Sequence, residues 1–336
     1  MAIAPLSANA LLEALDEPAL MVEGGRTLAA NAAARALFGS AIVGRDIRFA
    51  IRHPQALQAI LGGKHRDLAL VGLANAERPW QLSVRPIGKG ACLVRVTDRS
   101  VAVAAERMRV DFVANASHEL RTPLATISGF AETLAEDGPL DEDARRKFGA
   151  TIHNEAARML RIIEDLMGLS RIEADRFLAP RTTIDLGAVA RIAAQQVAAL
   201  AERKGCSIEV VADHAVPVIG DHAQLVQVAD NLVTNAVRYG CGTHASTVRI
   251  EILHDGTRGV LRVIDQGDGI SADHLPRLTE RFYRVDPARS RESGGTGLGL
   301  AIVKHIVERH RGTLDIRSRP GSGTTVEVRL PVPEDN

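Results

Sequence analysis

The sequence predicts a multidomain α+β protein with a mixed α/β module, a helical hairpin that pairs into a dimeric four-helix bundle, and an α/β sandwich. Apolar residues recur at steps of three and four from Val113 to Leu134, as in a helix that packs along another helix. Gly138-Pro139 interrupts this rhythm, which then resumes. Short strand-like runs flank the helical region on both sides. The predicted domains are residues 8–98, 99–175 and 182–331.

Composition excludes several classes of function. Lys plus Arg and Asp plus Glu both number 41 in 336 residues, so no bulk charge favours nucleic acid as a partner. No run approaches the roughly 18 apolar residues of a membrane span, so we expect a cytoplasmic protein or the cytoplasmic portion of a membrane-anchored receptor. Cys92, Cys206 and Cys241 are far apart and form no CxxC pair. They fit a reducing compartment and predict neither a metal site nor a disulfide framework.

The N-terminal module alternates helix and strand signals. We expect helices at 8–15 and 31–39, and strands at 19–23, 67–73, 80–86 and 91–98. This order, with the helix Asn31-Ala-Ala-Ala-Arg-Ala-Leu-Phe-Gly after the first hairpin, resembles a PAS sensor domain. The resemblance implies a module that senses a small ligand or mediates dimerisation.

His118 is the candidate catalytic side chain of the helical hairpin. It lies two residues from both Ala116 and Leu120, about 200° around the helix from each, and therefore faces water. Glu119 is its neighbour, and Thr122 follows one turn later. An exposed neutral imidazole is a good nucleophile, and a carboxylate beside it can take the second ring proton. A lone histidine of this kind would be an ordinary surface residue. The motifs further along the chain must therefore decide whether His118 is catalytic.

A second amphipathic helix completes the hairpin. Acidic residues at 141–143 suit a helix N-terminus, and the apolar rhythm runs to about residue 172. The stripe comprises Phe148, Ile152, Ala156, Met159, Ile163 and Leu166. A single hairpin leaves much of its apolar surface wet, so we expect a homodimer. The helical pattern that begins at Val101 continues into the hairpin without Gly or Pro until Pro123, which should bend the helix.

The C-terminal part reads as a separate α/β domain. We expect strands at 182–186, 207–212, 247–253, 259–265, 313–317 and 324–330, and helices at 187–203, 221–239 and 299–311. Adjacent late strands, such as those within 247–265, form hairpins, which argues against an all-parallel sheet.

Two motifs of this domain suit a metal–nucleotide complex. Asn231, Asn235 and Arg238 share one helical face, where amide oxygens could hold Mg²⁺ and the guanidinium could meet phosphate. Asp265-Gln-Gly-Asp-Gly-Ile follows a strand, and its carboxylate and glycines suit an adenine ring close to the backbone. Taken alone, the first motif would be a solvated helix face and the second a turn.

Two further motifs suit polyphosphate. The segment after Glu280 is rich in arginine, and its candidate phosphate clamps are Arg281, Arg284, Arg289 and Arg291. Gly294-Gly-Thr-Gly-Leu-Gly leads into a helix, whose unpaired N–H groups make a phosphate site. The run is not a Walker loop because no Gly-Lys-Ser/Thr follows, and no βαβ unit makes it a dinucleotide fingerprint.

In this order and spacing, the motifs resemble the sensor histidine kinases of two-component systems over residues 103–331. The resemblance implies a phosphoacceptor hairpin and a GHKL-type (Bergerat) ATP-binding sandwich shared with gyrase and the Hsp90 chaperone. Asp265 would bind adenine, Asn235 would hold Mg²⁺ with support from Asn231, and Tyr239 would pack near the base. The remaining ATP-binding candidates are Gly267, Gly269, Ile270, Phe282, Gly295, Thr296, Gly297, Leu298 and Gly299. The sequence of the segment Thr279-Glu-Arg-Phe-Tyr-Arg-Val-Asp is most similar to that of the phosphate-regulon sensor kinases.

This resemblance implies an autokinase that phosphorylates His118 and passes the phosphoryl group to an aspartate of a response regulator. We expect Glu119 to accept the ring proton of His118 and Thr122 to assist a reverse phosphatase activity. The connector at 173–182 would let the ATP domain swing, and a shift of the helical rod would bias that motion. Two alternatives remain: a dimeric ATP-binding scaffold and an ATP-driven clamp without phosphotransfer.

Overall fold

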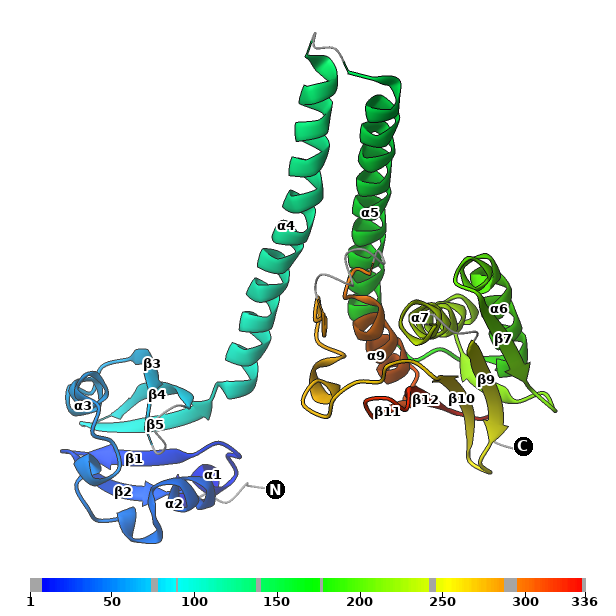
Figure 1. The fold of residues 1–336 in the computed structure, drawn as a ribbon. Helices are drawn as coiled ribbons and strands as arrows, with labels where there is room; N and C mark the ends of the chain where they lie inside the picture. Colours follow the sequence, from blue (N-terminus) through cyan, green and yellow to red (C-terminus); the bar gives the residue numbers. More distant parts are fainter. Residues whose placement is uncertain are drawn as a thin grey trace. The chain divides into compact units, whose positions relative to one another are not determined.

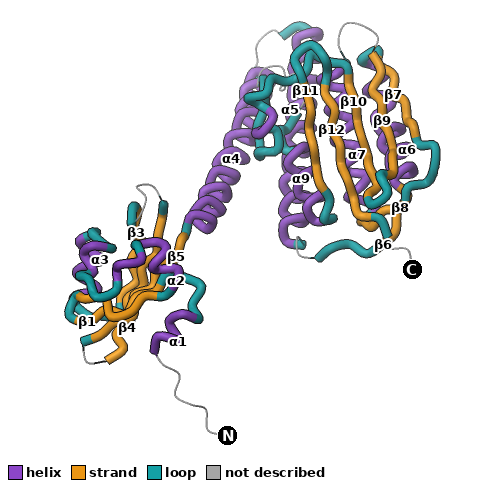
Figure 2. Tube along the Cα trace, turned by 90° about the horizontal axis from the view of Figure 1, so that it is seen from below, coloured by secondary structure: helices purple, strands orange, loops and turns teal. Residues whose placement is uncertain are grey.

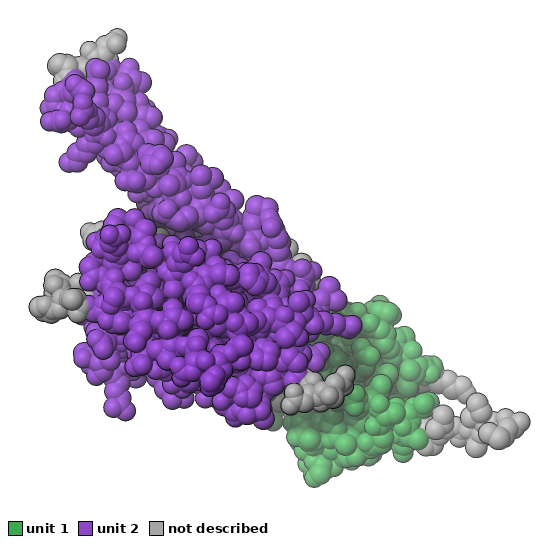
Figure 3. Space-filling model, turned by 90° about the vertical axis from the view of Figure 1, so that its right-hand side faces the viewer, with its two compact units in different colours: residues 1–113 green, residues 114–336 purple. Residues whose placement is uncertain are grey.

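The computed structural model describes residues 8–73, 78–88, 90–136, 140–175, 178–241, 246–286 and 295–333. The chain divides into two compact units, Met1–Val113 and Ala114–Asn336, coloured separately in Figure 3. The boundary falls inside a helix, and the hairpin belongs to the same unit as the C-terminal domain. The three-domain division remains a prediction. Within the described residues, none of the helices combines the length and the hydropathy that crossing a membrane requires.

The first unit is built around a five-stranded antiparallel sheet of order β2-β1-β5-β4-β3. Its strands are β1 Ala19–Glu23, β2 Arg26–Ala30, β3 Arg66–Val71, β4 Pro79–Gly88 and β5 Ala91–Asp98. Its helices are α1 Ala8–Glu13, α2 Ala32–Phe38 and α3 Pro54–Leu61. The sequence did not predict β2 or α3 as separate elements. Asn31 is fully buried, caps α2 through Ala34 N–H, and donates to the carbonyls of Leu15 and Glu17.

Helices α4 Ser100–Ala135 and α5 Glu142–Ala174 form the long hairpin, seen in Figure 1 as the two longest helices. Pro123 lies inside α4 without ending it. Asp141 caps α5 by accepting a 2.6 Å hydrogen bond from Ala144 N–H. The two helices meet at Phe130 and Phe148, whose ring centroids are 4.9 Å apart. The predicted turn at Gly138-Pro139 lies outside the described residues.

The C-terminal domain has a five-stranded sheet of order β11-β12-β10-β9-β7. Only the β7–β9 pair among these is parallel, so the prediction of hairpins among the later strands is confirmed. The strands are β7 Cys206–Val211, β9 Ser246–His254, β10 Arg258–Asp265, β11 Thr313–Ser318 and β12 Thr324–Pro331. A small second sheet pairs β6 Thr182–Asp185 with β8 Pro217–Gly220, a strand that the sequence did not predict.

Helices α6 Leu186–Arg203, α7 His222–Gly240 and α9 Gly299–Arg309 cover one face of the large sheet (Figure 2). Their inward faces are small and aliphatic. Val189, Val197, Leu225, Leu232, Val233, Ile302 and Ile306 are almost completely buried against sheet residues such as Ile250 and Leu261. The core of this domain is therefore built mainly from aliphatic side chains.

The expectation that the cysteines form no disulfide is wrong for two of them. Cys206 and Cys241 are bonded, with Cα atoms 5.9 Å apart and a sequence separation of 35. Cys206 begins β7 and pairs in register with Ser246 at the start of β9. Cys241 ends α7 shortly before Ser246, so strand pairing brings the two cysteines to one edge. Cys92 is free and buried.

Candidate active site

The polar face of α7 lies against the glycine run that opens α9. Asn231, Asn235 and Arg238 are half-buried on this face, while the opposite face packs into the core. A Cβ atom on Gly299 would lie only 2.9 Å from Asn231 Oδ1 and 4.0 Å from Asn235 Nδ2. The structure therefore brings the predicted asparagine and glycine motifs together. Tyr239 follows on the same helix and is 36% exposed.

Asp265 ends β10 with one carboxylate oxygen fixed by the backbone. Its Oδ1 accepts hydrogen bonds from Gly267 N–H at 3.0 Å and from Thr324 N–H at 3.2 Å. Burial raises the pKa of Asp265, and the two N–H donors oppose that shift. Among the described residues, Oδ2 has no hydrogen-bond partner, which leaves it as an acceptor for a ligand.

The glycines around Asp265 are explained by close packing of the backbone. A Cβ on Gly267 would lie 2.6 Å from Gly240 Cα, and one on Gly323 would overlap the carbonyl oxygen of Asp265. Gly269 has a positive φ of 68° and packs on the carbonyl of Arg319. These contacts give the glycines a packing role; that they also let a ring approach the backbone stays a prediction. Ile270 follows them and is held by its N–H donating to Ser318 Oγ at 2.8 Å.

The segment around Phe282 is tied to the glycine run. Phe282 N–H donates to the carbonyl of Gly297 at 2.8 Å, and Phe282 has a positive φ of 64°. Gly297 has φ 75°, and a Cβ there would lie 2.9 Å from the Phe282 backbone. Leu298 is fully buried, so its side chain belongs to the core although its sequence position suggested ATP binding. Gly295 is buried beside it.

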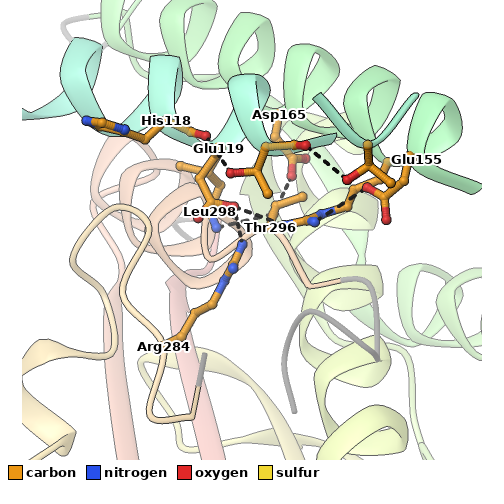
Figure 4. A network of polar contacts seen from close by, with 10 residues as sticks. His118, Glu119, Glu155, Asp165, Arg284, Thr296 and Leu298 are labelled. Atoms are coloured by element: carbon orange, nitrogen blue, oxygen red, sulfur yellow. Dashed lines mark hydrogen bonds and ion pairs between the residues drawn. The ribbon is translucent and has the colours of Figure 1, made fainter. Parts of the chain in front are cut away.

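His118 is exposed on α4, and Figure 4 shows its imidazole pointing away from the polar contacts around Glu119. Glu119 Oε2 accepts hydrogen bonds from Arg158 Nη2 on α5 and from Arg284 Nη2, each at 3.0 Å. Thr122 Oγ1 donates to the carbonyl of His118 at 3.2 Å, within its own helix. The candidate base is thus engaged by two guanidinium groups.

Two further contacts join the hairpin to the C-terminal domain. Thr296 Oγ1 donates to Asp165 Oδ2 on α5 at 2.7 Å and accepts from Leu298 N–H. Arg281 pairs with Glu173 near the end of α5. Burial raises the pKa of Asp165, and its hydrogen bond from Thr296 opposes that shift.

Helix α5 contributes residues that the sequence reasoning missed. Asp165 and Glu173 contact the C-terminal domain, and Arg158 contacts Glu119 on α4. The sequence reasoning recognised only the apolar stripe of α5 that begins at Phe148. A signal for Arg158 and Asp165 was a second stripe at 158, 162, 165, 169 and 172, in which charged residues are interspersed with buried aliphatic ones. The candidate clamps Arg289 and Arg291 lie outside the described residues.

The donor set is compatible with Mg²⁺ held jointly with a nucleotide. Among the described residues, no group of three or more His, Cys, Asp or Glu side chains could hold a metal alone. The asparagine oxygens at the glycine run are hard ligands of the type that Mg²⁺ accepts beside phosphate and water. Burial lowers the pKa of Arg238, and Asp230 and Asp165 stabilise its charge.

Family models define the class of both parts of this unit. Residues 108–175 match the His Kinase A phosphoacceptor domain, and residues 220–334 match the histidine kinase-, DNA gyrase B- and HSP90-like ATPase. The chain belongs to the sensor histidine kinases. The resemblance read from the motifs is therefore confirmed, including its similarity to phosphate-regulon kinases.

Curated relatives extend beyond this chain. It is 37% identical over 286 residues to the phosphate regulon sensor protein PhoR of Pseudomonas aeruginosa, covering 84% of this chain and 63% of that protein. It is 37% identical to the sensor-like histidine kinase SenX3 of Mycolicibacterium smegmatis, covering 71% and 62%. The chain thus spans less than two thirds of either relative.

Solved structures share the fold. The Acinetobacter baumannii histidine kinase AdeS aligns with a TM-score of 0.51 at 24% identity, covering 64% of this chain and 98% of that one. Histidine kinase ThkA, solved in complex with response regulator TrrA, aligns with a TM-score of 0.52 at 18% identity, covering 97% and 99%.

Proposed function

We propose that this chain is an ATP-dependent protein-histidine autokinase that phosphorylates His118 and passes the phosphoryl group to an aspartate of a response regulator. One observation carries the proposal. The exposed His118 and a site formed by Asn231, Asn235, Asp265 and the glycine run belong to one folded unit, linked by direct hydrogen bonds. Membership of the sensor histidine kinases supports the same activity.

Each part of the site has a role in holding ATP. Asp265 Oδ2 accepts a hydrogen bond from the adenine amino group, because Oδ1 is already engaged by the backbone. Asn235, supported by Asn231, holds Mg²⁺, which supplies positive charge to the phosphates. The N–H groups that open α9 face the phosphates, and Arg238 adds charge from α7.

Phosphoryl transfer then joins an imidazole nitrogen of His118 to the γ-phosphorus while the bond to the bridging oxygen breaks and ADP leaves. Glu119 takes the proton from the other ring nitrogen. The positive groups around the phosphates stabilise the charge that develops on the transferring group. The proposal requires a movement of the C-terminal domain relative to the hairpin that brings ATP to His118.

Labelling with γ-³²P-ATP tests this function. Wild-type protein should acquire label that is acid-labile and alkali-stable, as expected of a phosphoramidate, and His118→Gln should acquire none. Hydrolysis of ATP without protein labelling would favour the ATP-driven clamp. Nucleotide binding without either reaction would favour the dimeric scaffold.

Transfer to a response regulator is the second half of the proposal. The ThkA structure was solved with the response regulator TrrA, which supports a receiver domain as the partner class. Phosphorylated protein should lose its label to a cognate receiver domain and not to one whose acceptor aspartate is replaced by alanine. Because Mg-ATP is the substrate, we place this reaction in the cytoplasm.

The reverse phosphatase activity depends on Thr122, one helical turn from His118. Its hydroxyl must leave the His118 carbonyl, which it meets at 3.2 Å, to orient a water molecule. Thr122→Ala should slow dephosphorylation of the regulator while autophosphorylation continues. Unchanged dephosphorylation in this variant would remove Thr122 from the mechanism.

We also propose that two hairpins pair into a homodimeric four-helix bundle. Large apolar side chains lie exposed on both hairpin helices: Val113, Leu124, Leu160, Ile163 and Met167. Positions 160, 163 and 167 share one face of α5. An apolar stripe of this kind on a soluble chain calls for a covering partner, and a second copy supplies a matching stripe.

The first unit is proposed to be a PAS-like sensor, with phosphate status as the signal by analogy with PhoR. The antiparallel order β2-β1-β5-β4-β3 and the cap that Asn31 forms on α2 support this assignment. Helix α4 runs from Ser100 past His118 without interruption, which supports signalling through the rod. Equal autophosphorylation rates with and without residues 1–98, at all phosphate concentrations, would contradict it.

A further inference from the structure

The carboxylate of Glu119 is shared by two arginines of different origin. Arg158 belongs to the hairpin, and Arg284 belongs to the segment that Phe282 ties to the glycine run. Both guanidinium groups meet the same oxygen, Oε2, at 3.0 Å. Figure 4 shows Arg284 reaching up to Glu119. The side chains of Arg158 and Arg284 are only 8% and 7% exposed, so water screens these contacts weakly.

The two arginines are not equivalent. Arg158 also faces Glu155 at 3.6 Å, so it keeps a carboxylate on each side. Among the described residues, Arg284 has Glu119 as its sole ion-pair partner, and its Nε is buried without a hydrogen bond. Removing Arg284 leaves Arg158 between two carboxylates, a well-compensated arrangement. Removing Arg158 leaves Glu155 and Glu119 near each other with less compensation.

Arg284 is also close in sequence to the phosphate-binding backbone. It lies two residues after Phe282, whose N–H donates to Gly297 in the middle of the glycine run. A guanidinium group pairs with phosphate in the same bidentate manner as with carboxylate, so Glu119 and a nucleotide phosphate are competing ligands for it.

We propose that Arg284 exchanges between Glu119 and the phosphates of the bound nucleotide, and that Arg158 is the positioning residue that holds Glu119 once Arg284 has left. Binding of the nucleotide then releases Glu119 from Arg284 in the same step. Before ATP binds, Arg284 neutralises Glu119 and fastens the C-terminal domain to the hairpin. The inference rests on the proposed function because it assigns Glu119 as the base of that reaction.

Thermodynamic linkage makes the exchange measurable without any phosphoryl transfer. If Glu119 competes with phosphate for Arg284, removing the Glu119 charge must tighten nucleotide binding. We would measure the affinity for Mg-AMPPNP by calorimetry in His118→Gln protein. Adding Glu119→Gln should tighten binding about five-fold or more. Glu155→Gln is the matched control, because its carboxylate touches Arg158 and not Arg284, and it should leave the affinity unchanged.

A double-mutant cycle isolates the arginine. In an Arg284→Ala background, Glu119→Gln should no longer change the affinity. An affinity unaffected by Glu119→Gln, or an equal gain in the Arg284→Ala background, would overturn the exchange while leaving the proposed function intact. Failure of every variant to bind nucleotide would contradict the proposed function and the inference together.

Arg158 requires a separate kinetic readout in protein that retains His118. Arg158→Gln should lower kcat for autophosphorylation about ten-fold or more with little change in KM for ATP, because the base loses its orientation. Arg158→Lys should restore part of kcat by keeping the charge. An equal effect on KM, or no rescue by lysine, would overturn the positioning role.

Discussion

At the residue scale, His310 shows how a single buried imidazole joins two helices. It is 2% exposed, and its Nε2 accepts a 2.9 Å hydrogen bond from Asp221 N–H, the residue that caps α7. Its Nδ1 lies 2.7 Å from the carbonyl of Ile306 in α9, so the ring proton is on Nδ1. The bond accepted at Nε2 requires the neutral form of the ring, because protonation would turn this nitrogen into a donor.

We expect the α7–α9 contact to weaken in acid. Burial lowers the pKa of His310 below its ordinary value of about 6.5. Below that value the unfolded chain binds a proton that the folded chain resists, so stability that is fully present at pH 8 is lost progressively as the pH falls below about 6.5. Hydrogen exchange of α9 amides, corrected for intrinsic rates, should show this decline. His310→Gln should flatten it, and an unchanged slope in that variant would contradict the assignment.

The second prediction at the residue scale concerns the effect of Asp265 on nucleotide affinity. Asp265→Asn replaces an acceptor by an N–H₂ group, so nucleotide binding should weaken about ten-fold or more, as expected for a lost charged hydrogen bond. Asp315→Asn is a suitable control because Asp315 in β11 shares a sheet face with Arg262 and Glu327, opposite to the face of the buried Leu261 and Val328. Calorimetric titration with Mg-ATP analogues would measure both. Equal affinity in Asp265→Asn and wild type would exclude Asp265 from the site.

At the scale of elements, α5 explains why part of the structure was predictable and part was not. The stripe that includes Phe148 was visible as a three-and-four rhythm, and Phe148 itself contacts Phe130 of α4. The stripe at 158, 162, 165, 169 and 172 was not recognised, because two of its positions are charged. Ile162, Leu169 and Ile172 are nevertheless almost completely buried. Periodicity detects apolar faces and overlooks faces that are completed by ion pairs.

Substitution on the exposed stripe of α5 tests the dimer. Ile163→Glu would place a charge within an apolar interface and should weaken self-association about 100-fold or more. Arg145→Glu, an exposed change on the same helix, should leave the mass in solution unaltered. Sedimentation velocity over a range of concentrations distinguishes the two results. A dimer of undiminished affinity in Ile163→Glu would place the interface elsewhere.

The disulfide between β7 and the end of α7 gives the second expectation at this scale. Closing a loop of 35 residues constrains the unfolded chain, which the chain-entropy model values at about 4 kcal/mol. Cys206→Ser/Cys241→Ser should lower the free energy of unfolding of the C-terminal domain by about 2–4 kcal/mol. Reducing agent should have the same effect on wild type and none on the variant. Titration of three free thiols in denatured, unreduced protein would contradict the bond; one free thiol is expected.

At the scale of the whole molecule, the order of the chain's parts and its strongly periodic elements followed from local patterns. Helices α4 to α7 and α9, and strands such as β10 and β12, lie within a few residues of their predicted positions. The short strands β2 and β8 escaped because they carry too few alternating residues to stand out. The disulfide escaped because strand register, not sequence spacing, brings its cysteines together.

The candidate site likewise has residues that could be predicted from the sequence and contacts that could not. The motif residues around Asn235 and Asp265 were identified, since each motif is local and contiguous. The contacts Glu119–Arg284 and Asp165–Thr296 join residues 165 and 131 positions apart, and no local pattern encodes such pairs. The sequence reasoning therefore did not predict the contacts that join the C-terminal domain to the helical hairpin.

The crowding of glycines around Asp265 limits how base preference could be changed. Gly240, Gly267 and Gly323 reach Asp265 from the end of α7, from the loop after β10 and from the turn before β12, and none leaves room for a methyl group. Under the proposed function, these three positions around the adenine-binding Asp265 cannot take a larger side chain. Retuning the enzyme for guanine or for a bulky ATP analogue should therefore keep these three residues and vary the walls, beginning with Tyr239 and Ile270.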